Sequence, residues 1–226
     1  MILLIFDLDG TLVDSQHPHY LAFKDAFNEF GFEFTEGDFR LLFGKLWRDI
    51  VKDYLVSRGL EPNTVDYVKL ADRKQEIFRE RYVDGVRAFP GVKENLINLR
   101  QEGYMLALAS NSPRKNIDGM LLSSELAGLF DFIVGVDEVP HPKPHPSMLI
   151  KACDTLKVSA EMAVAVDDSL HGIHAGKDAG MKTVAVLTGG SSEAELKGLN
   201  PDLIVGSAAD LDKSSVNALF KVGDNQ

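Results

Sequence analysis

The chain has almost no cysteine and no long hydrophobic run. Cys153 is the only cysteine among 226 residues, so no disulfide can form within one chain. Sequences without a disulfide framework are typical of a reducing compartment. No apolar stretch approaches the roughly 20 residues of a membrane-spanning helix, and Met1–Phe6 is too short for the apolar part of a signal peptide. We therefore expect a cytoplasmic protein that does not bind membranes.

Positive charge is also scarce. The 24 Lys and Arg residues face 34 Asp and Glu residues, which gives a net charge of −10 at pH 7. This balance argues against a partner such as nucleic acid or an anionic membrane, because no basic field would attract either. Small phosphorylated substrates stay open, because a bound cation can reverse the charge of a site. The length allows one or two domains.

Short apolar runs separated by helical patterns are the main feature present. Ile2–Phe6 has no polar face and predicts a strand buried on both sides of a parallel sheet. Further predicted strands are Met105–Ala109, Phe132–Val134, Met162–Val166, Thr183–Leu187 and Leu203–Val205. Predicted helices are Val92–Leu99, Ile117–Leu126, Met148–Leu156, Ile173–Ala179 and Leu211–Val222. The alternation predicts an α/β fold with a doubly wound parallel sheet.

One long stretch breaks this alternation. Between residues 16 and 87 no strand pattern appears, and apolar residues recur at helical spacing. Three faces are apparent, made by Tyr20, Phe23, Phe27 and Phe30, by Trp47, Ile50, Val51, Tyr54 and Leu55, and by the longer stretch Val65–Tyr82. We therefore predict an all-helical domain at 16–87, inserted into a core domain of residues 1–15 and 88–226. Its phenylalanines are expected to form its own core.

Polar residues follow the predicted strands. They are Asp7, Asp9, Ser110, Lys143, Asp167 and Asp168. Because the carboxyl ends of parallel strands share one edge, we expect these side chains to converge on one crevice. Carboxylates that lie so close together repel one another unless a cation lies among them. A site with oxygen ligands and no cysteine favours Mg²⁺. A lysine and a hydroxyl beside such a metal predict a site for a phosphoryl group.

The order of these residues resembles the four motifs of the haloacid dehalogenase (HAD) superfamily. The matching segments are Asp7-x-Asp9-Gly10-Thr11-Leu12-Val13-Asp14-Ser15, Ser110-Asn111, Lys143-Pro144-x-Pro146 and Asp167-Asp168-Ser169. The run Ala175–Met181 resembles the family as well. The helical insert is similar to the cap of subfamily I members, such as phosphoglycolate phosphatases and β-phosphoglucomutase-like proteins. The resemblance implies a Rossmann-like core domain carrying a cap domain.

The resemblance also implies a role for each motif residue. Asp7 would attack phosphorus to form an aspartyl-phosphate, and Asp9 would act first as acid and then as base. Ser110 and Lys143 would hold the phosphoryl oxygens, and Asn111 would contact the substrate. The implied Mg²⁺ ligands are the Asp7 carboxylate, the Asp9 backbone carbonyl, Asp168 and Asp167.

The last motif departs from the commonest family pattern. Many members read Gly-Asp-Ser-x-x-Asp, with acids four residues apart. Here Asp167 stands at the glycine position and Gly172 at the second aspartate position. This is similar to the branch with two adjacent acids, which includes β-phosphoglucomutase-like proteins and several sugar phosphatases. Asp168 is the clearer metal ligand, and direct and water-mediated contacts of Asp167 both stay open.

Candidate substrate ligands also occur in the helical insert. His19 stands where mutase-like members carry a hinge histidine, and an exposed residue near a helix start is an equal interpretation. Lys45 and Arg48 could bind a distal anion, although a solvated helix face accounts for them better. Four further histidines have spacings compatible with zinc, which we disfavour because no cysteine-rich partner set accompanies them. They are His141, His145, His171 and His174.

Together these features predict a Mg²⁺-dependent phosphatase of a small soluble phosphomonoester, of the phosphoglycolate or sugar-phosphate type, with the cap as a mobile lid. A phosphomutase of the β-phosphoglucomutase type is the alternative, because of the adjacent acids and His19. A dehalogenase is disfavoured because halide displacement does not need Asp9. A non-catalytic binding protein is disfavoured because it would not need the complete motif set. The substrate is open, as is the choice between monomer and homodimer.

Overall fold

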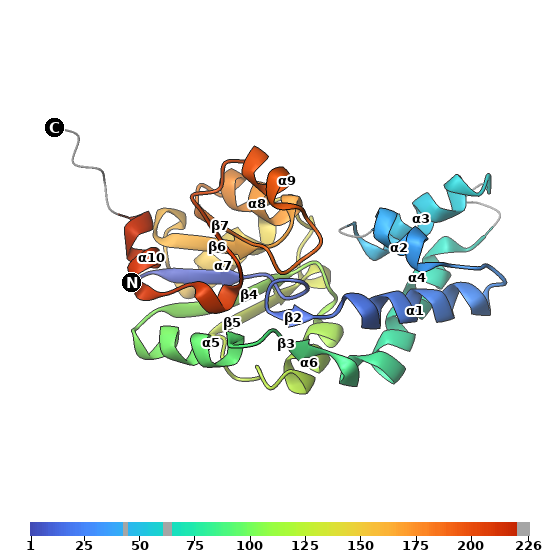
Figure 1. Cartoon of the computed structure of the whole chain (residues 1–226), viewed down its shortest axis with the longest axis horizontal. Coiled ribbons are helices and arrows are strands. Elements are labelled where there is room, and N and C mark those ends of the chain that lie inside the picture. Colours follow the sequence, from blue (N-terminus) through green and yellow to red (C-terminus); the bar gives the residue numbers. More distant parts are fainter. Residues whose placement is uncertain (43–44, 61–64, 221–226) are drawn as a thin grey trace. The chain divides into compact units, whose positions relative to one another are not determined.

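The computed structural model describes residues 1–42, 45–60 and 65–220. The chain divides into two compact units. One comprises Met1–Asp14 and Arg87–Gln226, and the other comprises Ser15–Val86 (Figure 1). We call them the core unit and the helical unit. Within the described residues, no helix combines the length and the apolar character needed to cross a membrane.

A six-stranded parallel sheet forms the centre of the core unit. Its strands are β1 (Leu3–Phe6), β4 (Met105–Ser110), β5 (Phe132–Gly135), β6 (Ala163–Asp167), β7 (Lys182–Val186) and β8 (Leu203–Val205). They lie in the order β5-β4-β1-β6-β7-β8. All four residues of β1 are buried, as expected for a central strand with both faces covered. The predicted doubly wound α/β fold is confirmed.

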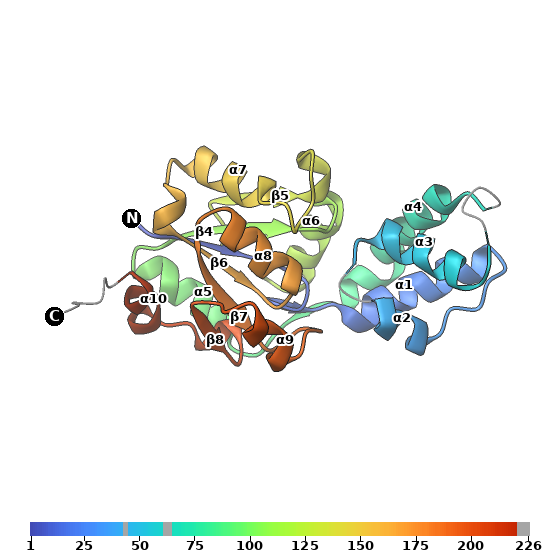
Figure 2. The same ribbon diagram turned by 90° about the horizontal axis from the view of Figure 1, so that it is seen from above.

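Helices cover both faces of this sheet. Those of the core unit are α5 (Val92–Gln101), α6 (Arg114–Ser123), α7 (Ser147–Leu156), α8 (Leu170–Asp178), α9 (Glu193–Gly198) and α10 (Lys213–Leu219). Short 3-10 turns lie at Val136–Glu138, Ala160–Met162 and Ala208–Asp210. Helices α7 and α8 lie on one face, and α5 and α6 on the other (Figure 2). Because all six strands run parallel, their carboxyl ends lie along one edge of the sheet.

Alternate strand residues build the core beneath α7 and α8. Leu3 and Ile5 of β1 and Ala163 and Ala165 of β6 are buried in one apolar cluster with residues of both helices. The period of two places these side chains on one face. The alanines allow α8 to approach closely, because a Cβ on Gly176 would lie only 2.8 Å from the Cβ of Ala165. Small residues in β6 therefore determine where α8 lies.

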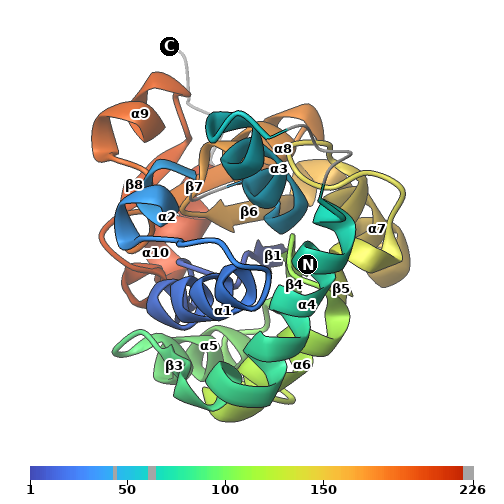
Figure 3. The same ribbon diagram turned by 90° about the vertical axis from the view of Figure 1, so that its right-hand side faces the viewer.

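The helical unit has no strand among its described residues. It comprises α1 (Gln16–Glu29), α2 (Glu36–Leu42), α3 (Trp47–Ser57) and α4 (Tyr67–Ile77) (Figure 3). Helix α4 continues as a π-helical turn at Phe78–Tyr82, followed by a 3-10 turn at Val83–Gly85. Aromatic rings fill its centre, and the Phe27 and Phe34 rings stack with centroids 4.6 Å apart. The phenylalanine core expected from the sequence is therefore present.

Several elements differ from the sequence prediction. Two pairs of residues, β2 (Val13–Asp14) and β3 (Arg87–Ala88), form a small antiparallel ladder where no strand was predicted. Arg87, predicted as the last residue of the helical insert, belongs to this ladder. Two short helices, α2 and α9, were not predicted. The closing helix predicted at 211–222 is shorter, and residues 221 and 222 lie outside the described residues.

Candidate functional site

The carboxyl ends of β1 and β6 place three acids together. Phe6 pairs with Val166, so Asp7 and Asp167 follow at neighbouring points of the same sheet edge. The side chains of Asp7, Asp167 and Asp168 each offer a carboxylate oxygen within 4.8 Å of the other two. All three residues are at most 9% exposed. The sheet therefore concentrates three carboxylates in a nearly buried space.

Lys143 bridges two of these acids. Its Nζ donates to Asp7 Oδ1 at 2.9 Å and to Asp167 Oδ2 at 2.8 Å, and the residue is only 5% exposed. Burial alone would lower the pKa of Lys143, but the charges of Asp167 and Asp7 outweigh it and hold the pKa above its ordinary value. The ammonium therefore stays charged and offsets part of the repulsion between the acids.

One cation does not balance all the acids. Burial and, after it, the neighbouring charge of Asp167 raise the pKa of Asp168 to about 7, against the opposing effect of a hydrogen bond from Thr11. Burial likewise raises the pKa of Asp7 well above its ordinary range, although Lys143 opposes this shift. Ionised acids therefore cost free energy here unless a second cation joins them. Three oxygen donors with no sulfur ligand fit Mg²⁺.

Residues near the acids hold Asp168 in place and leave room for it. Thr11 Oγ1 donates to Asp168 Oδ1 at 2.8 Å and accepts from the Asp168 amide at 3.1 Å. Gly10 has φ +84°, the left-handed conformation expected for the sharp turn after β1. A Cβ on Gly189 would lie 1.6 Å from Asp168 Oδ2. Sequence reasoning missed Gly189, because no local pattern shows that this loop passes beside the acid.

Asp9 is held by two serines that follow β4. Ser112 Oγ donates to Asp9 Oδ2 at 2.8 Å, and Ser110 Oγ lies 3.3 Å from the same oxygen. The Ser112 amide donates in turn to Ser110 Oγ at 3.0 Å. Ser112 was not among the predicted site residues. Its position two residues after Ser110, in the Ser-Asn-Ser turn, is the signal that could have identified it.

Asn111 connects the end of β4 to the loop that carries Lys143. Its Nδ2 donates to the Lys143 carbonyl oxygen at 3.2 Å, and its Oδ1 accepts from the Lys143 amide at 3.0 Å. The side-chain amide thus fixes the Lys143 backbone by a pair of hydrogen bonds. The predicted contact of Asn111 with substrate stays a prediction.

The predicted substrate ligands of the helical insert lie in the helical unit. The His19 ring stacks on Phe78 with centroids 4.2 Å apart, and its Nδ1 lies 2.8 Å from Nζ of the buried Lys74. Lys45 and Arg48 form exposed ion pairs with acids of α3 and α4. These contacts do not test substrate binding, so the role of all three residues in it stays a prediction.

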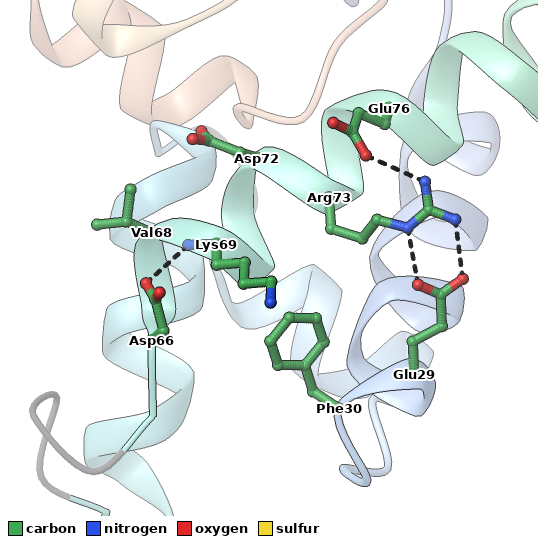
Figure 4. Close-up of a pocket in the computed structure, with 8 residues that line it drawn as sticks. All are labelled: Glu29, Phe30, Asp66, Val68, Lys69, Asp72, Arg73 and Glu76. Atoms are coloured by element: carbon green, nitrogen blue, oxygen red, sulfur yellow. Dashed lines mark hydrogen bonds and ion pairs between the residues drawn. The ribbon is translucent and has the colours of Figure 1, made fainter.

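The other candidates do not form comparable sites. The rings of His141 and His145 lie 4.7 Å apart, but the acids above are the only group of three or more potential metal ligands found in the described part of the chain. A groove of about 760 Å³ on the helical unit is lined by six charged residues and by Phe30 and Val68 (Figure 4). In it Arg73 donates to Glu29 at 2.8 and 3.1 Å.

Comparisons with known proteins agree with the motifs. Residues 4–186 match the family model described as haloacid dehalogenase-like hydrolase. The chain is 31% identical over 225 residues to the probable phosphatase IndB of Dickeya dadantii, covering 99% of this chain and 96% of that protein. It is 31% identical over 228 residues to a phosphoglycolate phosphatase of Aquifex aeolicus, covering 98% and 100%.

Solved structures show the same fold. CbbY from Rhodobacter sphaeroides, solved in complex with phosphate, superposes with a TM-score of 0.84 at 24% identity, covering 96% of this chain and 100% of that chain. The family model spans most of the sequence, and both curated relatives align over nearly its whole length. The chain therefore belongs to the haloacid dehalogenase-like hydrolases.

Proposed function

We propose that this protein is a Mg²⁺-dependent phosphatase that hydrolyses a small phosphomonoester through an aspartyl-phosphate. The observation that carries this proposal is the ammonium of Lys143, held between Asp7 and Asp167 in a nearly buried cluster with Asp168. Such a cluster gives a carboxylate nucleophile a cationic setting in which a phosphoryl group can bind. The phosphatase names of the two curated relatives support the same reaction type.

The chemistry divides between two aspartates. Asp7 attacks phosphorus while the ester P–O bond breaks, and protonated Asp9 gives its proton to the leaving oxygen. Asp9 then takes a proton from a water molecule whose oxygen attacks phosphorus. The P–O bond to Asp7 breaks, and inorganic phosphate leaves. Ser112, which donates to Asp9 at 2.8 Å, restricts where that carboxyl can lie during both transfers.

The remaining residues bind and orient. Asp7, Asp168, Asp167 and the Asp9 carbonyl would hold Mg²⁺, which when bound offsets negative charge on the phosphoryl group. Lys143 and Ser110 bind phosphoryl oxygens, and Asn111 fixes the backbone of Lys143. His19, Lys45 and Arg48 are proposed to contribute to substrate binding.

A panel of phosphomonoesters tests this function. Phosphoglycolate, hexose phosphates and p-nitrophenyl phosphate are incubated with protein and Mg²⁺, with EDTA as control. We expect phosphate release that requires Mg²⁺, and a loss of at least about 10⁴-fold in Asp7→Asn, because the nucleophile is gone while the fold is kept. Mg²⁺-dependent turnover by Asp7→Asn at the wild-type rate would contradict the mechanism.

A phosphomutase on the same site is the second candidate. The adjacent acids Asp167 and Asp168 motivate it, as does His19, which stands where mutase-like members carry a hinge histidine. A sugar 1-phosphate primed with the corresponding bisphosphate separates the two reactions, because isomerised sugar phosphate indicates a mutase and free phosphate indicates a phosphatase. Halide release from a haloacid without Mg²⁺ would instead indicate a dehalogenase.

A further inference from the structure

Gly172 lies against the carboxylate of Asp167. A Cβ built on Gly172 would be 1.8 Å from both Cγ and Oδ2 of Asp167 and 2.3 Å from Oδ1. Unbonded atoms do not approach this closely. Any side chain at position 172 therefore needs the volume that the Asp167 carboxylate fills.

The Asp167 carboxylate is not free to give way. Its Oδ2 accepts from Lys143 Nζ at 2.8 Å, and its Oδ1 accepts from Ser169 N at 2.9 Å and from Ser169 Oγ at 2.7 Å. Ser169 Oγ also accepts from the Gly172 amide at 3.0 Å at the start of α8. Displacing the carboxylate would remove one of the two acids that hold Lys143 and disturb the first turn of α8.

The backbone does not explain the glycine at this position. Gly172 lies within α8, and its φ is not among the positive values of the chain. Glycine is unfavourable in a helix compared with other residues. The space beside Asp167, and not the conformation of the chain, is what demands glycine here.

Asp167 and Gly172 lie five residues apart, at the end of β6 and in the first turn of α8. We propose that positions 167 and 172 form a reciprocal pair that shares one carboxylate volume beside Lys143. In this chain the side chain of Asp167, at the end of β6, fills the volume. A side chain at position 172 of α8 can fill it only when position 167 has no side chain. Gly172 is thus a positioning residue for Asp167, an inference that rests on the proposed Mg²⁺ site.

Four variants test the pair. They are Asp167→Gly, Gly172→Asp, the double variant Asp167→Gly/Gly172→Asp and the double variant Asp167→Asn/Gly172→Asp. We expect each single variant to lose about 10- to 100-fold in Mg²⁺ affinity, measured by calorimetry on metal-free protein, and in kcat/KM for p-nitrophenyl phosphate. In the double variant Asp167→Gly/Gly172→Asp, Mg²⁺ affinity and kcat/KM should be at least about tenfold higher than in Gly172→Asp. The double variant with asparagine should not recover, because asparagine keeps the volume filled.

Controls separate this effect from misfolding. Gly198→Asp adds a carboxylate to α9, where a new Cβ meets nothing within 4 Å, and should leave Mg²⁺ affinity unchanged. Thermal unfolding in EDTA shows whether each variant is folded. If Gly172→Asp does not fold, Gly172→Ala takes its place, because a methyl group alone also enters the volume of the carboxylate.

The outcomes are distinct from those for the proposed function. Equal recovery by both double variants, no recovery by either, or wild-type Mg²⁺ affinity in Gly172→Asp or Gly172→Ala would overturn the reciprocal pair. Absence of phosphatase activity in the wild-type protein would overturn the function alone, because Mg²⁺ calorimetry and unfolding do not depend on turnover.

Discussion

The core unit holds a nearly buried cluster of charged residues, whereas the ion pairs described in the helical unit are partly exposed. In the core unit, Asp7, Lys143, Asp167 and Asp168 are at most 9% exposed, the three carboxylates lie within 4.8 Å of one another, and Lys143 donates to two of them. In the helical unit, ion pairs such as Lys45 with Asp53 and Arg48 with Asp72 have side chains that are 42–52% exposed. Lys74 is an exception, with its ammonium 4.6 Å from the centroid of the Phe23 ring.

The difference follows from desolvation. A buried charge costs several kcal/mol unless partners compensate it, whereas an exposed pair contributes about 0–1 kcal/mol. The core unit carries its costly charges at one sheet edge, where the proposed chemistry needs them. The helical unit gains its stability from packed aromatic rings such as Phe27 and Phe34, and its surface charges contribute little.

The largest effect is expected from removing the buried cation. Lys143→Met leaves Asp7 and Asp167 without their shared donor, so metal-free protein should lose about 3–5 kcal/mol of unfolding free energy. Chemical denaturation in EDTA measures this loss, and Mg²⁺ should restore more stability to the variant than to wild type. Lys182→Met is the matched control, because its partner Asp202 is partly exposed and the pair is worth about 1 kcal/mol or less. Equal losses of unfolding free energy in the two variants would contradict the difference between buried and exposed charges.

A pH dependence is expected from Asp168 in metal-free protein. Its pKa of about 7 in the fold exceeds the ordinary value of 3.8, so the native state binds the proton more tightly than the unfolded state does. The contribution of Asp168 to the free energy of unfolding is therefore fully present at low pH, and it is lost as pH rises through about 7. Denaturation series in EDTA should therefore show a less negative slope in Asp168→Asn than in wild type between about pH 4 and pH 7. Identical slopes would show that the acid titrates normally.

A smaller effect is expected from the serine that holds the proposed acid. Ser112→Ala removes the 2.8 Å hydrogen bond to Asp9, so kcat should fall about tenfold for an alkyl phosphomonoester with KM nearly unchanged. The fall should be smaller for p-nitrophenyl phosphate, whose leaving group needs little protonation. Ser112→Thr keeps the hydroxyl and should retain most of the rate. An equal fall with both substrates would contradict a role through Asp9.

The smallest effects on stability are expected in the helical unit. Lys45→Ala and Arg48→Ala break exposed ion pairs, so the free energy of unfolding should change by less than about 0.5 kcal/mol. Steady-state kinetics on the best substrate of the panel tests their proposed role. A raised KM with unchanged kcat would show that they bind substrate. An unchanged KM would mean that these charges only solvate the helix surface.

Local patterns made much of the core unit predictable. The apolar runs identified all six strands of the main sheet within one residue at each end, since a strand buried on both faces consists mainly of apolar residues. The two-residue strands β2 and β3 escaped prediction because such short segments have no periodicity. Helix α2 was missed for a related reason, because only Phe39 of its seven residues is buried.

Motif spacing and strand ends are local properties, so the polar residues that follow the strands could be predicted from the sequence. Which of their atoms meet depends on the tertiary structure. Lys143 reaches Asp7 from 136 residues away, Ser112 reaches Asp9 from 103 residues away, and Gly189 leaves room for Asp168. Such contacts depend on how parallel strands align and where loops cross the sheet edge, and both are set by packing of the whole core. The same packing explains why Gly172, five residues after Asp167, must be small.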